Sequence, residues 1–289
     1  MLEFRKIEIE DAELFNSFIK LNTERSCENT FINLFMWRDC YNNMIAVEND
    51  TLFIKSGSGD RQSFALPIGG DIKSGVEKIK EYSGEKPVFW LQDCDRFEEF
   101  KEIYANEYTL EEIRKNFDYI YLTENLANLV GKKYHSKRNH INSFSKKYEW
   151  RYETVTSQNI DAVKLCAEKW YAEKQDKMDS HMICERKGLY VILDNFEKLN
   201  IKAGAIFVGD EVVAFTMGSH INDEIYNIHT EKALEEYAEA YSVINREFAK
   251  NELSDYKYIN REDDMGLEGL RKAKLSYYPD IILKKYIAR

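Results

Sequence analysis

The sequence is poor in proline and glycine and lacks a long apolar run. It has 3 Pro and 13 Gly in 289 residues, which excludes collagen-like and low-complexity chains. No stretch approaches the roughly 18 apolar residues that a membrane-spanning helix needs. The first ten residues include three acids and no apolar signal-peptide core. We therefore expect no leader and no membrane span, and we predict a cytoplasmic protein.

Cysteines are few and widely spaced, and no CxxC or Cys/His metal spacing occurs. This pattern predicts no metal site and no nucleophilic thiol, and it is typical of a protein in a reducing compartment whose cysteines act as small core residues. The five cysteines are Cys27, Cys40, Cys94, Cys166 and Cys184.

Acids outnumber bases, 51 to 41, so the formal net charge is −10. Attraction of the whole molecule to nucleic acid or anionic lipid is therefore not expected, and any such contact requires a local basic patch. The hydrophobic fraction of 44% and the charged fraction of 32% are those of a globular protein. The length fits two domains or one large one.

Several common catalytic motifs are missing from the sequence. It contains no GxSxG, no GxxxxGK[ST], no GxGxxG and no HExxH. The α/β-hydrolases, P-loop nucleotide hydrolases, dinucleotide-dependent dehydrogenases and zinc proteases thus lose their usual sequence support.

Hydrophobic periodicity in the first half predicts alternating helices and strands. Asn49 and Asp50 are expected to form a hairpin turn, and Asp71 is expected to cap a helix. The helices are predicted at 11–20, 29–41, 71–82 and 97–104, and the strands at 44–47, 52–54, 64–68 and 87–91.

The second half shows the same alternation of helices and strands. This alternation predicts an α/β protein with α+β mixed sheets covered by helices. We place a boundary near 123–131, which gives domains 1–125 and 126–289. In the second domain we predict strands at 150–155, 202–207, 212–217, 225–229, 256–259 and 281–286, and helices at 159–172, 189–199 and 238–249.

Two charged segments are candidates for chemistry. Residues 131–147 (GKKYHSKRNHINSFSKK) carry six Lys and Arg and no acid, a composition that attracts phosphates. A solvated helix joining two domains is the alternative. Residues 260–274 (NREDDMGLEGLRKAK) follow a predicted strand, and the carboxyl edge of such strands is a common ligand site. Their alternative is a salt-bridged loop and helix. Near strand ends, His220 or His229 could relay a proton, although structural histidines are commoner there.

Three stretches together resemble a known family. They are GKKYHSKRNHINSF at 131–144, GAIFVGDEVVAFTMGSHINDEIYNIHTEKA at 204–233 and YINREDDMGLEGLRKAKLSYYPDIILKKY at 258–286. They resemble an uncharacterised bacterial family related to the C-terminal domain of phosphatidylglycerol lysyltransferase. The resemblance implies two GNAT-like (acyl-CoA N-acyltransferase-like) domains in tandem, a fold shared in outline with the Fem peptidyltransferases.

The resemblance also implies an acyl- or aminoacyltransferase whose charged groups line a cleft between the two halves. Acyl transfer from an ester needs a base or positioning acid, cations that hold the donor phosphate, and a donor to the oxyanion. The resemblance supplies candidates for the first two and none for the third. The implied catalytic residues are Glu231, Glu262 and Asp263, and the implied substrate-binding residues are Lys137, Arg138, Arg261, Arg271 and Lys274.

Two departures from the family pattern bear on the substrates. The lysyltransferase has a multi-span membrane part that this sequence lacks, so the acceptor, whether lipid, peptide or small molecule, stays open. The GNAT pyrophosphate loop [QR]xxGx[GA] is also missing, and EEYAEA stands at 235–240, where acids would repel a CoA pyrophosphate. Aminoacyl-tRNA is therefore the favoured donor, with tRNA as a partner and acyl-CoA as the other donor considered. A CoA-dependent N-acetyltransferase and a non-catalytic binding module are the alternative functions.

Overall fold

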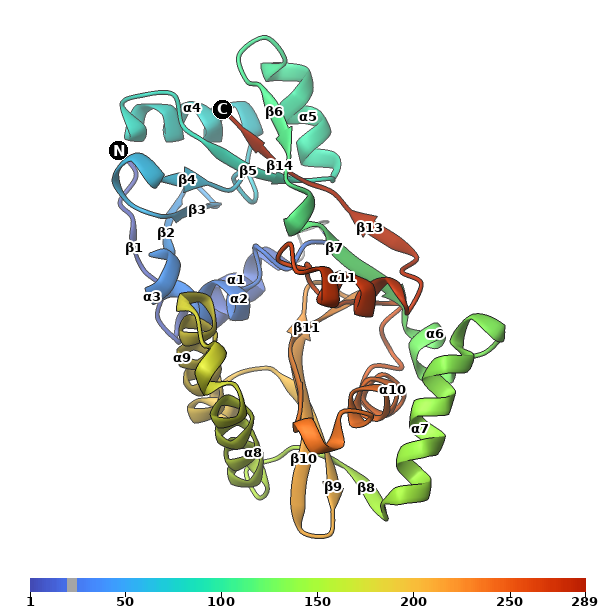
Figure 1. Cartoon of the computed structure of the whole chain (residues 1–289). Helices are drawn as coiled ribbons and strands as arrows, with labels where there is room; N and C mark the ends of the chain where they lie inside the picture. The colour runs from blue at the N-terminus through green and yellow to red at the C-terminus, as the bar shows by residue number, and fades with distance from the viewer. Residues whose placement is uncertain (20–24) are drawn as a thin grey trace. The chain divides into compact units, whose positions relative to one another are not determined.

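The computed structural model describes residues 1–19 and 25–289 (Figure 1). The chain forms two compact units, and each unit is assembled from segments that are separate in the sequence. The first unit comprises Met1–Asp118, Glu262–Arg271 and Ile282–Arg289, and the second comprises Tyr119–Arg261 and Lys272–Ile281. The domain bounds 1–125 and 126–289 stay a prediction, since the first compact unit also contains two segments from the C-terminal part of the chain.

The sheet of the first unit has seven strands in the order β1-β2-β3-β4-β5-β14-β6. Neighbouring strands are antiparallel except β4 and β5, which are parallel. Asn49 and Asp50 both have positive φ in the β2–β3 turn, so the predicted hairpin is confirmed. The strands are β1 (Arg5–Lys6), β2 (Met44–Glu48), β3 (Thr51–Ser56), β4 (Ser63–Phe64), β5 (Phe89–Gln92), β6 (Leu110–Glu112) and β14 (Lys285–Ala288).

The strand predicted at 281–286 is wrong as a single element. The chain forms two strands there, β13 (Ile281–Leu283) in the second sheet and β14 in the first. The apolar pattern runs on through both, and local sequence carries no sign of a change of sheet. The strand predicted at 64–68 is also shorter, because beyond Phe64 only Ile68 bridges to Leu52.

The helices of the first unit largely follow their apolar periodicity. Asp71 caps its helix by accepting from the backbone N–H of Ser74 at 2.7 Å, as predicted. The helix predicted at 29–41 is two helices that meet at Trp37, and Lys20, the predicted end of the first helix, lies outside the described residues. The helices are α1 (Asp11–Ile19), α2 (Phe31–Met36), α3 (Arg38–Tyr41), α4 (Ile72–Ser83) and α5 (Asp95–Tyr104).

The second sheet also has seven strands, in the order β13-β7-β12-β11-β10-β9-β8. β11 and β12 are parallel, and the strands from β11 to β8 form an antiparallel meander. The meander was predicted from three apolar runs with Gly209 in the turn, where its φ of 59° is left-handed. The strands are β7 (Asp118–Leu122), β8 (Trp150–Thr154), β9 (Lys202–Val208), β10 (Glu211–His220), β11 (Ile225–Ala233) and β12 (Tyr258–Asn260).

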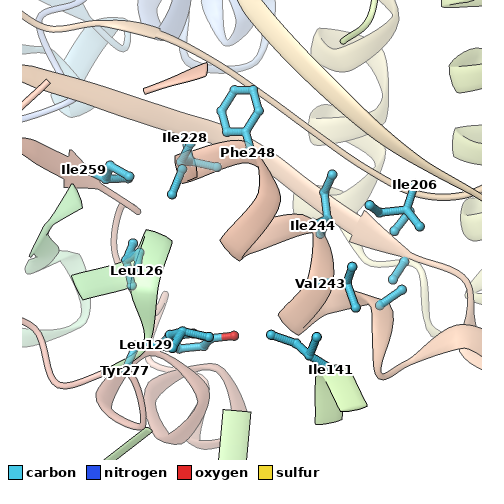
Figure 2. Close-up of a cluster of buried hydrophobic side chains, with 14 of the residues drawn as sticks. Leu126, Leu129, Ile141, Ile206, Ile228, Val243, Ile244, Phe248, Ile259 and Tyr277 are labelled. Carbon is cyan, nitrogen blue, oxygen red and sulfur yellow. The ribbon is translucent and has the colours of Figure 1, made fainter. Parts of the chain in front are cut away.

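One helix organises the core of the second unit. α10 (Ala240–Glu252) packs on one face of the meander, whereas α8 (Ile160–Glu173) packs against β10 and β11 (Figure 1). Figure 2 shows Val243, Ile244 and Phe248 of α10 among side chains of the sheet and the flanking helices. The helix predicted at 189–199 begins earlier, and its last residues form a separate 3₁₀ turn. The remaining helices are α6 (Thr123–Asn128), α7 (His135–Lys147), α9 (Ser180–Asp194) and α11 (Glu268–Leu275).

Two of the predicted core thiols, Cys27 and Cys166, are buried, and burial raises the pKa of both. The core prediction is wrong for Cys40, Cys94 and Cys184, which are half-buried. Among the residues that the structure describes, no helix has the length and apolar character needed to cross a bilayer.

Candidate functional site

Two of the predicted site residues form a nearly buried ion pair in the second unit. Glu231 lies on β11, and Arg261 directly follows β12. The Arg261 Nη2 and Glu231 Oε1 atoms are 2.7 Å apart, and each side chain is 12% exposed. Asn245 of α10 donates to the other carboxylate oxygen at 3.1 Å. The pair is thus held from the sheet and from the helix that covers it.

The Arg261 guanidinium lies against aromatic rings. Its central carbon is 4.8 Å from the ring centre of Tyr277 and 5.8 Å from that of Tyr121. Burial is the largest single effect and opposes the charge of Arg261, but Glu231 together with Tyr121 and Tyr277 outweighs burial, so the pKa of Arg261 is raised. Its Nη1 atom is buried and has no hydrogen-bond partner in the described part of the chain. A buried cationic donor without a partner costs free energy, so Nη1 is suited to holding a ligand atom.

Lys137 of α7 completes this cluster. Its Nζ lies 4.0 Å from the ring centre of Tyr277, and no side-chain or backbone acceptor binds it within the described residues. Burial and the nearby Arg261 lower its pKa to about 8, against a smaller opposing effect of Glu231. A lysine with this pKa is partly neutral in mildly alkaline solution and can accept a proton.

Lys274 meets the cluster through the backbone. Its Nζ donates to the carbonyl oxygen of Arg261, and the Tyr121 hydroxyl donates to the carbonyl oxygen of Lys274 at 2.8 Å. Lys274 is 8% exposed. These contacts fix the chain at the point where Arg261 leaves β12, so the structure favours a positioning role for Lys274.

Arg138, the neighbour of Lys137, is bound to backbone. Its Nη1 donates to the carbonyl oxygens of Leu129 and Gly131, which lie between α6 and α7. The Arg138 side chain therefore stabilises the connection between α6 and α7. These contacts do not direct it toward Glu231 or Arg261.

The remaining predicted residues belong to the first unit. Asp264, which is fully buried, accepts from Arg271 at 2.8 and 2.9 Å and from Arg114 at 3.1 Å. Glu262 has a φ of 58°, in the left-handed region that is unfavourable for a residue with a Cβ. Asp263 accepts from the backbone N–H of Met265 at 2.9 Å. The chain therefore bends sharply immediately after β12.

The structure thus assembles Lys137, Glu231, Arg261 and Lys274 in the second unit, and Glu262, Asp263 and Arg271 in the first. Their assigned roles, and a site in a cleft between the halves, stay predictions. Sequence reasoning missed Tyr277 and Asn245. Only their neighbours in the fold distinguish these two residues from other Tyr and Asn residues.

A second buried ionic group, also missed, lies in the first unit. Lys285 of β14 is 2.7 Å from Asp118 Oδ1 and 2.7 Å from Glu28 Oε1. Burial is the largest single effect and opposes the charge of Lys285, yet Asp118 together with Cys27 and Glu28 outweighs burial, and the pKa of Lys285 is raised well above its ordinary value. The Cys27 sulfur lies 3.8 Å from both Lys285 Nζ and Asp118 Oδ1. This network joins the last strand to the segment that precedes α2 and to the first residue of β7.

Comparison with known proteins assigns the chain to a family. Residues 19–289 match the family described as phosphatidylglycerol lysyltransferase, C-terminal. The match covers most of the chain, which therefore belongs to this family, and the predicted resemblance is confirmed.

Three solved structures support the fold assignment. A conserved protein of unknown function from Bacteroides thetaiotaomicron VPI-5482 is 38% identical, with a TM-score of 0.91 over 100% of this chain and 99% of that chain. L-PGS from Bacillus licheniformis is 15% identical, with a TM-score of 0.68 over 96% of this chain and 91% of its own. FemX is 8% identical, with a TM-score of 0.60 over 99% of this chain and 96% of its own. The predicted mixed α/β, tandem GNAT-like fold is confirmed.

Proposed function

We propose that this chain transfers an aminoacyl group from an aminoacyl-tRNA to a hydroxyl or amine acceptor. The observation that carries the proposal is the half-buried cluster of Lys137, Arg261 and Glu231, which combines a proton acceptor with a buried guanidinium nitrogen that has no partner among the described residues. Family membership supports the same reaction class. The acceptor's identity stays open.

In this proposal Lys137 removes the proton of the attacking acceptor. The acceptor oxygen or nitrogen bonds to the ester carbonyl carbon, its proton passes to the neutral amine of Lys137, and the ester bond to the terminal ribose breaks. The ribose oxygen takes that proton from the Lys137 ammonium as it leaves, which returns Lys137 to its neutral form. The pKa of about 8 suits this task, because an ordinary lysine would remain protonated.

Arg261 and Glu231 are each assigned two tasks. Arg261 helps to lower the pKa of Lys137, and its buried Nη1 donates to an oxygen of the bound substrate. Glu231 keeps Arg261 in place, and its ionised carboxylate has lone pairs beyond those used by Arg261 and Asn245. An aminoacyl ammonium group is a suitable donor to those lone pairs.

The donor's phosphates are assigned to the basic segment 131–147. Lys132 and Lys133 are exposed there, and the segment contains no acid. Phosphate contacts need no base recognition, so such a surface can hold tRNA without reading its sequence.

An acyl-CoA donor is less well supported. The turn before α10 carries Glu235 and Glu236, and Glu239 occupies the N-cap position. Glu235 pairs with Lys174 at 3.1 Å, and Glu239 pairs with Lys147 at 2.9 Å. Carboxylates at a helix N-terminus compete with a pyrophosphate for the same backbone N–H groups.

The test is a transfer assay with tRNAs charged with radiolabelled amino acids, one amino acid at a time. Phosphatidylglycerol vesicles, peptides and simple amines serve as acceptors, and labelled acetyl-CoA is assayed in parallel. We expect label to leave tRNA only in the presence of the protein, and we expect none to leave acetyl-CoA.

The matched pair of variants is Lys137→Met and Lys257→Met. Both lysines lie over a tyrosine ring, but Lys257 is exposed and its ring is Tyr258, not the Tyr277 of the cluster. Transfer should fall roughly 100- to 10,000-fold for Lys137→Met and stay unchanged for Lys257→Met. Transfer from acetyl-CoA alone, or no transfer from any charged tRNA, would refute the proposal.

A further inference from the structure

Two consecutive tyrosines of the second unit have opposite surroundings. Tyr277 is 5% exposed and belongs to the cluster of Lys137 and Arg261, whereas Tyr278 is 47% exposed. Both tyrosines and the basic segment 131–147 belong to the second unit. Because the Cα atoms of consecutive residues are about 3.8 Å apart, the chain holds the exposed tyrosine next to the cluster.

The backbone at Tyr278 has an unfavourable conformation. Its φ is 54°, in the left-handed region that residues with a Cβ seldom adopt. Pro279 follows, and a proline favours extended conformations for the residue before it. Residues that keep such a conformation are concentrated at active sites and ligand-binding sites. The conformation therefore marks Tyr278 as a candidate binding residue.

Basic residues lie beside the Tyr278 ring. The Lys133 ammonium is 5.5 Å from the ring centre of Tyr278 and 4.9 Å from that of Tyr134. The two rings meet edge to face, with their centres 5.8 Å apart. Lys132 and Lys133 are exposed, and neither has an acidic partner in the described part of the chain. Asp280 is engaged elsewhere, because it accepts from the last backbone N–H of β7 at 2.8 Å.

An exposed aromatic ring flanked by cations suits single-stranded nucleic acid. Bases stack on such rings whatever their sequence, while the cations hold the phosphates. Two lysines four positions apart lie over the two tyrosines, Lys137 over buried Tyr277 and Lys133 over exposed Tyr278. A terminal nucleotide carries its base and its aminoacyl ester on one ribose, so a ring that binds the base must lie close to the reacting groups. The exposed pair meets this requirement.

We propose that Tyr278 stacks against an unpaired base at the 3′ end of the donor RNA, with Lys133 at the adjoining phosphate. This inference rests on the proposed aminoacyl transfer and identifies the surface of the second unit that receives the end of the donor. Tyr278 is a binding residue and takes part in no proton transfer. Its stacking contributes affinity that depends on the base, whereas Lys132 and Lys133 contribute affinity that depends on salt.

The first experiment observes the stacking directly. The probe is an uncharged RNA hairpin whose unpaired 3′ bases are replaced, one at a time, by 2-aminopurine, a fluorescent base that is quenched when it stacks. We expect quenching at one position on binding to wild type, and loss of that quenching in Tyr278→Ala. Tyr278→Phe keeps the ring and should keep the quenching. Tyr41→Ala is the matched control, because Tyr41 is 46% exposed and also adjoins an aromatic ring.

The second experiment separates stacking from charge. Tyr278→Ala should weaken binding of the hairpin roughly 5- to 150-fold and leave the slope of log Kd against log salt unchanged. Removal of the quenched base alone should weaken binding to wild type by a similar factor and cost Tyr278→Ala nothing further. Thermal melts check folding. Tyr278→Asn is the second variant, because asparagine tolerates the left-handed conformation better than alanine does.

The outcomes separate this inference from the proposed function. If the hairpin binds but the losses from Tyr278→Asn and from base removal add, the stacking assignment is overturned while aminoacyl transfer stands. If quenching depends on Tyr278 but no charged tRNA is a donor, the proposed transfer is overturned while the base-binding surface stands. If the hairpin does not bind wild type at low salt, both are overturned.

An anionic membrane is the other occupant that the experiment tests. Val130, which precedes the two lysines, is 74% exposed, and an apolar residue beside cations also suits a lipid surface. Phosphatidylglycerol vesicles are therefore titrated in parallel. Vesicle binding that is lost in Tyr278→Ala, with RNA binding unchanged, would overturn the stacking assignment. RNA binding that is lost in this variant, with vesicle binding unchanged, supports it.

Discussion

A single lysine carries much of the chemistry proposed for the second unit. Lys137 is held over Tyr277 beside Arg261, and burial there lowers its pKa to about 8. The same burial costs stability, since the unfolded chain keeps this lysine protonated to a higher pH than the folded chain does. Site residues of this kind trade stability for activity.

We therefore expect Lys137→Met to be more stable than wild type at pH 7. The gain should be about 1 kcal/mol after allowance for partial exposure, or a rise in Tm of roughly 2 to 4 °C. Between about pH 8 and pH 10 the folded lysine is neutral while the unfolded one is still charged, so wild-type stability rises with pH and the gap should close. Thermal melts of both proteins across this pH range measure the effect.

The same variant should lose transfer activity, and wild-type kcat/KM should rise through about pH 8 to a plateau. Lys257→Met is the control and should change neither quantity. Equal stability of Lys137→Met and wild type at every pH would contradict the buried, shifted lysine.

At the scale of elements, the basic residues in and around α7 form two sets with different surroundings. Arg138 is bound to the backbone carbonyls before the helix, and Lys146 and Lys147 lie in its last turn, where cations interact favourably with the helix dipole. Lys132 and Lys133 precede the helix and are exposed. The first set supports the helix, and the second set is available for phosphates.

We expect the paired variant Lys132→Ala/Lys133→Ala to weaken tRNA binding and to reduce the slope of log Kd against log salt by about one to two units. Arg138→Ala should leave that slope unchanged and lower Tm, because it removes hydrogen bonds within the fold. Titrations at several salt concentrations measure the slopes. A larger change of slope in Arg138→Ala than in the paired variant would reverse this assignment.

At the scale of the whole molecule, the end of the chain completes the sheet of the first unit. β14 lies between β5 and β6 and pairs antiparallel with both. Lys285 of this strand also holds Asp118 and Glu28. Residues from the end of the chain therefore form the interior of a sheet whose other six strands come from the first 112 residues.

Removal of residues 284–289 should therefore destabilise the first unit, because it leaves two inner strand edges unpaired and Asp118 buried without its lysine. We expect loss of cooperative unfolding for that unit and faster hydrogen exchange in β2 through β6. Lys285→Met, which removes only the charge, should also destabilise, by about 3 to 5 kcal/mol, through the unpaired carboxylate. Native-like exchange in the truncated chain would contradict the central position of β14.

Local sequence determined most of the helices and the meander of this protein. The Asp71 cap, the Asn49-Asp50 turn and the apolar stripes of α8 and α10 are encoded within a few residues, and for that reason they were predictable. The family could be predicted as well, because its motifs are contiguous stretches of sequence. Of the candidate site, Glu231, Arg261 and Lys137 were named from those motifs.

Only the tertiary structure decided which of these residues meet. Arg261 and Glu231 are thirty positions apart and pair because β11 and β12 are parallel neighbours. The segment 281–286 is divided between two sheets, and Tyr277 and Asn245 acquire their surroundings from other elements of the fold. Hydrogen bonds across strands and burial depend on pairing between remote segments, and local periodicity does not specify such pairing.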